Sequence, residues 1–158
     1  MKKPWNRTDQ PVYSVSSFHA GAANMHICTY STAVSMQPKR FMVALYKHTR
    51  TLDLVERERR LVLQLLAAGQ YRLIPLLGRK SGHDTDKLSI LERRGLLTRW
   101  DGVAVLDEAL AWMHLSVIDT LDAGDHVMML CDLDRYRNHR EGEPLTLDIL
   151  RQRGMIRN

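Results

Sequence analysis

The sequence predicts a mainly β protein whose strands close into an antiparallel barrel, with a few short helices covering it. About six segments of strand length, rich in β-branched, aromatic and small residues, follow one another at short spacing. Few helical segments lie between them, so the regular alternation of strand and helix that gives a parallel sheet is missing. Short strands joined by turns are typical of antiparallel barrels, which remove exposed sheet edges by closing.

The first three strands are expected at residues 12–17, 25–32 and 41–46. Turn-forming Gly21 and Asn24 separate the first two, which indicates a loop between two strands. The third is a compact apolar run of strand length. These segments predict the first part of the barrel.

A short amphipathic helix is expected after the third strand. Leu52, Leu54 and Val55 lie among acidic and basic residues, and Thr51 is the expected N-cap. Residues 61–66 then form an apolar run interrupted by one glutamine, which indicates a buried strand.

The second half of the chain contains two helical segments and a predicted hairpin. Residues 70–77 and 84–94 have helical spacing and are expected to cover one end of the barrel. Residues 111–119 alternate between two faces, and residues 126–133 form their partner strand. The turn between them, at residues 122–125, places a histidine at the start of the second arm.

The C-terminal residues are expected to form a last short helix. Thr146 is its predicted N-cap, residues 147–153 have helical spacing, and Gly154 follows as the stop. A strand is the alternative for this segment. The length of 158 residues suits one domain, so we expect a single domain over residues 1–158.

The composition excludes several classes of protein. Hydrophobic residues make up 44% and charged residues 26%, as in soluble globular proteins. The chain has no apolar run of the roughly 18 residues that a membrane span needs, and its first ten residues are polar. We therefore expect a cytoplasmic protein. Cys28 and Cys131 have no close cysteine partner and the seven histidines are scattered, so buried thiols and no metal site are expected.

The chain is basic, with a formal net charge of +5 and an isoelectric point near 9.5. This charge suits nucleic acid, but it equally suits a phosphate or a dinucleotide. The basic residues are spread along the chain, and the densest run, residues 56–60, has acids interleaved. This distribution disfavours nucleic-acid binding. The glycine signatures of the two common nucleotide-binding turns are also missing.

Residues 47–52 carry two cations and two hydroxyls where a strand runs into a helix N-terminus. Free backbone N–H groups and the helix dipole favour an anion there, and Arg50 can add a charge-assisted hydrogen bond. The other interpretation is ordinary helix capping, with Thr51 as N-cap and Asp53 complementing the dipole. The local sequence alone favours capping.

Three ordered motifs resemble the flavin reductase family, the FMN-binding split barrel. The first covers residues 24–38 and continues at 41–52. The second, residues 78–88, is similar to the family's Ser-Gly and Asp-Lys element, and the third, residues 121–126, is similar to its Gly-Asp-His hairpin. Together the motifs span most of the chain. The resemblance implies a split antiparallel Greek-key β-barrel.

The resemblance also implies a set of cofactor-binding residues. The flavin ring and ribityl chain would contact Thr29, Tyr30, Ser31, Thr32 and Ser35. The phosphate would be held by Lys47, Thr49, Arg50 and Thr51. His126 would line the exposed flavin face where the nicotinamide stacks, and the alternative for His126 is a strand-start histidine bonded to a carbonyl.

The function that the resemblance implies is an NAD(P)H-dependent flavin reductase. The expected cofactor is FMN, with FAD as an alternative, and NAD(P)H would be the cosubstrate that passes a hydride to the flavin. A homodimer with the flavin near the interface is expected, and a flavin-dependent monooxygenase or another electron acceptor is the expected partner. The alternative function is an FMN-binding electron carrier with little nicotinamide activity.

Overall fold

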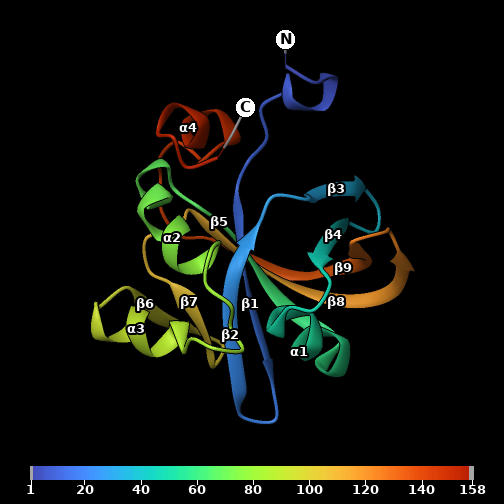
Figure 1. Ribbon diagram of the computed structural model, residues 1–158. Helices are drawn as coiled ribbons and strands as arrows, with labels where there is room; N and C mark the ends of the chain where they lie inside the picture. The colour runs from blue at the N-terminus through green and yellow to red at the C-terminus, as the bar shows by residue number, and fades with distance from the viewer. Residues whose placement is uncertain (1, 157–158) are drawn as a thin grey trace.

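The computed structural model describes residues 2–156, which form one seven-stranded antiparallel sheet, a separate hairpin and short helices (Figure 1). The strands are β1 (Tyr13–His19), β2 (Ala22–Cys28), β3 (Ser31–Ser35), β4 (Arg40–Tyr46), β5 (Arg60–Leu65), β6 (Leu97–Trp100), β7 (Val103–Leu106), β8 (Ala111–Asp122) and β9 (His126–Asn138). The α-helices are α1 (Arg50–Glu58), α2 (Ile74–Leu77), α3 (Lys87–Arg93) and α4 (Leu147–Gln152), and the 3-10 helices are η1 (Pro4–Asn6) and η2 (Ala68–Leu73). Between residues 2 and 156, no helix combines the length and the apolar character that a membrane span requires.

The order of the strands requires the large sheet to curl into a split barrel. The order is β2-β1-β5-β8-β9-β4-β3, so β2 and β3 form opposite edges. Only Thr29 and Tyr30 connect these two edge strands along the chain, and so short a connection reaches no more than about 10 Å. The backbone N–H of Ala44 on β4 also donates to the carbonyl of Tyr30 at 2.8 Å. The predicted split antiparallel barrel is therefore confirmed.

Most predicted strands are found, but one expected strand is in fact two. Residues 25–32 were expected to be continuous, whereas β2 ends at Cys28 and β3 begins at Ser31. The break is where the chain crosses from one edge of the sheet to the other. The β6–β7 hairpin was not predicted, and it pairs Leu97 with Leu106 and Trp100 with Val103.

The sheet is buried on both of its faces, which explains the continuous apolar run of β5. Inside the barrel, Val15, Leu61 and Leu115 pack with α1 residues. On the outer face, Val62 and Trp112 belong to a cluster with residues of η2, α2, α3, α4 and the β6–β7 hairpin. Strands with two buried faces lack the simple alternation of a half-exposed strand.

The predicted C-terminal helix is confirmed as α4. The hydroxyl of Thr146 accepts a hydrogen bond from the backbone N–H of Ile149 at 3.4 Å, as an N-cap does. The free thiols of Cys28 and Cys131 are buried, as expected.

Candidate functional site

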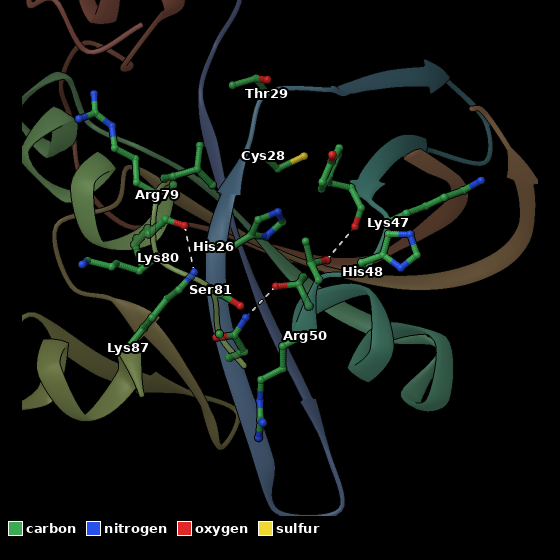
Figure 2. Close-up of a pocket in the computed structure, with 18 of the residues that line it drawn as sticks. His26, Cys28, Thr29, Lys47, His48, Arg50, Arg79, Lys80, Ser81 and Lys87 are labelled. Atoms are coloured by element: carbon green, nitrogen blue, oxygen red, sulfur yellow. Dashed lines mark hydrogen bonds between the residues drawn. The ribbon is translucent and has the colours of Figure 1, made fainter. Parts of the chain in front are cut away.

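A cavity of about 490 Å³ lies where the barrel is split, beside the ends of β2 and β4. Its other walls are the segment that leads into α1 and the loop of residues 78–86 between α2 and α3. In the view of Figure 2, Arg79, Lys80 and Ser81 lie on one side of β2, and Lys47 and His48 lie on the other. The cavity is thus built by segments that are far apart in the sequence.

The Lys and Arg side chains that line the cavity give its wall an excess of positive charge. Five cationic side chains line it, from three parts of the chain: Lys47, Arg50, Arg79, Lys80 and Lys87. Among the described residues that line the cavity, none is an aspartate or a glutamate. Such an arrangement attracts an anion and repels a metal ion.

The first turn of α1 opens into this cavity. The N-cap is Thr49, and the expectation that it would be Thr51 is wrong. The Thr49 hydroxyl accepts a hydrogen bond from the N–H of Leu52 at 3.2 Å. It also donates one to the carbonyl of Tyr46 at 2.8 Å. The N–H groups of Arg50 and Thr51 occupy the first two helical positions, where no acceptor exists within the helix. These donors and the dipole of the nine-residue helix suit an anion.

Thr51 is not the cap because it is the second residue of α1, and its hydroxyl serves another contact. The residue is completely buried, and its Oγ1 accepts a hydrogen bond from Asn24 Nδ2 on β2 at 2.9 Å. This bond ties the start of α1 to the strand that forms the cavity floor.

Two of the predicted phosphate-binding cations extend away from the middle of the cavity. The ammonium group of Lys47 pairs with Asp122 at 2.9 Å. Figure 2 shows the Arg50 side chain extending away from Cys28 and Thr29. Arg50 also lines a neighbouring hollow whose other walls are residues 21–24 and, across the cavity, residues 82–89. Its guanidinium therefore lies at the rim between the two walls.

Lys87 is the most deeply buried of the five cations. Only 3% of the residue is exposed, and its Nζ donates a hydrogen bond to the carbonyl of Leu77 at 3.1 Å. Burial lowers the pKa of the ammonium group from 10.5 to about 8. A desolvated cation of this kind is stabilised by an anionic ligand.

His26 and Cys28 lie on β2 at the back of the cavity (Figure 2). Burial, together with the nearby charges of Lys87 and His126, lowers the pKa of His26 to about 4, so the ring is neutral at pH 7. Its Nδ1 atom is buried without a hydrogen-bond partner. Burial raises the pKa of the Cys28 thiol to about 12, which makes this group a poor nucleophile.

His126 stands at the mouth of the cavity between two tyrosines. The ring centroids of Tyr30 and Tyr46 lie 5.1 Å and 5.3 Å from that of His126, and both tyrosines are more than half exposed. The Nδ1 atom of His126 lies 2.6 Å from an oxygen of Asp125. The hydrogen-bond partner is thus a carboxylate and not the carbonyl considered as an alternative.

The structure gathers seven of the ten predicted site residues around this cavity. They are Thr29, Tyr30, Lys47, Thr49, Arg50, Thr51 and His126. Ser31 and Thr32 line an adjacent hollow that shares Thr29, Tyr30 and His126 with the cavity. Ser35, at the far end of β3, lines neither of these two spaces.

Several lining residues were not among the predicted site residues. They are Asn24, His26, Arg79, Lys80, Ser81 and Lys87. The sequence did contain a signal for four of them, because a glycine-punctuated basic stretch at residues 78–87 follows a short helix. The sequence had no signal that this stretch faces residues 47–51.

The family model described as "Flavin reductase like domain" matches residues 5–154, which is nearly the whole chain. The chain belongs to the flavin reductase-like family. A curated relative, a putative diflavin flavoprotein A 2 from Nostoc sp. (strain PCC 7120), is 24% identical over 154 residues, or 97% of this chain. The match covers 26% of that relative, so this flavin reductase-like chain spans about a quarter of its length.

Solved structures share the fold of this flavin reductase-like chain. An FMN-binding protein from Thermus thermophilus has a TM-score of 0.76 at 21% identity, over 88% of this chain and 76% of the other. BorF, the flavin reductase component of a bacterial two-component tryptophan halogenase, has a TM-score of 0.77 at 19% identity, over 90% of this chain and 88% of the other. At these identities the likeness establishes the fold alone.

Proposed function

We propose that this protein binds FMN in the cationic cavity and reduces it with a nicotinamide dinucleotide. The single observation that carries the proposal is the cavity wall, which has five Lys or Arg side chains and no carboxylate among its described residues. An unpaired helix N-terminus adds fixed donors on the same wall. Membership of the flavin reductase-like family supplies the cofactor class.

The residues present fit a flavin mononucleotide. The phosphate would lie against the N–H groups of Arg50 and Thr51, with the Arg50 guanidinium and the buried Lys87 ammonium adding positive charge. The ring would lie along Thr29 and Tyr30, close to the unpartnered Nδ1 atom of His26. FAD, which contains the same flavin and first phosphate, is the second candidate.

When bound, the flavin would supply the redox chemistry, accepting two electrons and a proton as hydride from C4 of the nicotinamide at its N5 atom. The protein would position both rings and provide a positive field for the charge that develops on reduction. The exposed faces of Tyr30 and Tyr46 provide an apolar platform for the nicotinamide. His126, whose Nδ1 atom lies 2.6 Å from Asp125, would orient that ring through its Nε2 atom.

The test is uptake and reduction of flavin by the purified protein. The protein should retain or take up FMN, and anaerobic addition of NADH or NADPH should bleach its absorption. Failure to take up FMN would overturn the proposal. Binding without reduction by either nucleotide would instead indicate an electron carrier.

We expect His126→Ala to keep FMN bound and to slow its reduction by the nicotinamide. The side chain lies between the two tyrosines of the proposed nicotinamide platform, so the affinity for the nicotinamide should fall more than the affinity for FMN. Stopped-flow reduction across nicotinamide concentrations measures this effect. Unchanged rates would mean that His126 only supports the hairpin.

We infer that the protein works as a homodimer. Hydrophobic residues that are more than two fifths exposed occur on β3, directly after it and on the far part of β8: Val34, Met36, Ile118 and Leu121. β3 is also an unpaired edge of the large sheet, and its exposed backbone groups favour pairing or coverage. Light scattering should give about twice the 18.2 kDa chain mass. A monomer that still binds FMN tightly would contradict this inference.

The reduced flavin would pass to a partner protein. BorF, which shares the fold, is described as the reductase component of a two-component halogenase. A cavity that is open at the split of the barrel allows the flavin to leave without unfolding any strand. We therefore propose a flavin-dependent monooxygenase or a similar electron acceptor as the partner.

A further inference from the structure

The two cationic walls of the cavity meet at one buried side chain, Asn24 on β2. Only 4% of Asn24 is exposed. On one side, its Nδ2 atom donates to Thr51 Oγ1 at 2.9 Å, in the first turn of α1. On the other side, the backbone of Gly82 lies directly against its carboxamide.

The contact with Gly82 is too close for any side chain. A Cβ atom at position 82 would lie 2.5 Å from Oδ1 of Asn24 and 2.7 Å from Cγ and Nδ2. The backbone of Gly82 is not in the left-handed region, so the need for glycine comes from this approach alone. The carboxamide therefore fixes how near the loop of residues 78–86 comes to the start of α1.

Within residues 2–156, one ion pair joins a side chain of the loop directly to α1. His83 Nε2 lies 3.5 Å from an oxygen of Asp53, but both side chains are about half exposed. An exposed pair of this kind contributes little, typically about 0–1 kcal/mol. The buried contact of Asn24 is therefore the one that sets the spacing.

We propose that Asn24 is a positioning residue that holds the loop of residues 78–86 against the first turn of α1, and so sets the gap between the two groups of cations. The identification of the anion in this gap as the FMN phosphate rests on the proposed function. Lys87 directly follows the loop on one wall and Arg50 begins α1 on the other, so a shift of the loop changes the separation of two charges that would act on one phosphate.

The test compares Asn24→Ala, Gly82→Ala and the double variant with the native protein. Each single change should lower FMN affinity about tenfold, because a lost buried hydrogen bond or a displaced loop costs about 1.4 kcal/mol of phosphate binding. The double variant should bind FMN no worse than Asn24→Ala, because the small alanine leaves room for the new methyl group. His83→Gln is the matched control and should bind FMN with nearly native affinity.

Riboflavin separates positioning from general damage. It lacks the phosphate, so its affinity should stay close to native in every variant. Equal losses of riboflavin and FMN, or additive effects of the two substitutions, would overturn the proposal. Because Gly82 lies in a loop, Gly82→Ala remains informative even if Asn24→Ala fails to fold.

Hydrogen exchange of the flavin-free proteins tests the contact without any ligand. Asn24→Ala should speed amide exchange in both the loop and the first turn of α1, and His83→Gln should not. Native exchange rates in Asn24→Ala would overturn the positioning role. If the native protein binds no FMN, the proposed function fails while this measurement still decides the role of Asn24.

Discussion

Replacing Arg50 with glutamate should weaken FMN binding by roughly 10- to 150-fold. The substitution removes a charge-assisted hydrogen bond to the phosphate, which is worth about 1.5–3 kcal/mol, before any added repulsion is counted. Arg50 is the first residue of α1 and lies at the rim where both walls of the cavity meet. Isothermal titration with FMN measures the change directly.

If residues 49–53 only cap the helix, Arg50→Glu should leave the affinity for FMN almost unchanged. A glutamate in the first turn of a helix is neutral or stabilising by a few tenths to about 1 kcal/mol, so FMN affinity would barely change. Arg57→Glu is the matched control, because it alters the net charge equally at the exposed end of the same helix. Riboflavin should bind native protein and Arg50→Glu almost equally. A matched loss of riboflavin would indicate misfolding and defeat the phosphate role.

Replacing Lys87 with methionine should remove an alkaline pH dependence of stability and weaken flavin binding. The pKa of Lys87 is about 8 in the folded protein and 10.5 in its ordinary state. Between these values the unfolded chain holds more protons, so the native protein should gain stability as the pH rises from 8 to 10.5. The gain is about 3 kcal/mol, since each pKa unit corresponds to about 1.4 kcal/mol. Below pH 8 the buried charge remains as a fixed cost.

Denaturant unfolding of the flavin-free proteins gives the free energy of unfolding at each pH. The prediction concerns how the difference in this free energy between Lys87→Met and the native protein changes from pH 8 to 10.5. Lys80→Met is the control, because Lys80 lines the same cavity but is exposed. Lys80→Met should keep the native pH dependence and lose less FMN affinity than Lys87→Met. Parallel stability curves for native protein and Lys87→Met would contradict the prediction. Unchanged FMN affinity in Lys87→Met would show that the ammonium does not face the ligand.

Local patterns were sufficient wherever a single segment decides the outcome. The apolar run at residues 61–66 and the alternation at residues 111–119 correspond to β5 and β8. Thr146 caps α4 as expected, because one hydroxyl and a nearby N–H settle that contact. The predicted hairpin between β8 and β9 is also found, with His126 at the start of its second arm.

Local patterns failed where two segments compete for the same group. Thr49 and Thr51 are equally good caps by residue type, and the sequence favoured Thr51. The structure has Thr49 at the cap and Thr51 inside the first turn, where its hydroxyl accepts from Asn24, 27 positions earlier in the chain. The expected strand at residues 25–32 is two strands because the chain crosses there from one edge of the sheet to the other, and that crossing depends on the pairing order of all seven strands.

The sequence by itself determined the class of this protein: a β-barrel with a basic, hydroxyl-rich segment ahead of its first long helix. Periodicity and residue type carry that information, because they act over a few neighbouring residues. Only the tertiary structure decided that Arg79, Lys80 and Lys87 face that segment across one cavity. Their positions depend on the curl of the whole sheet and on the contact between Asn24 and Gly82, and no local pattern encodes a distance across the barrel.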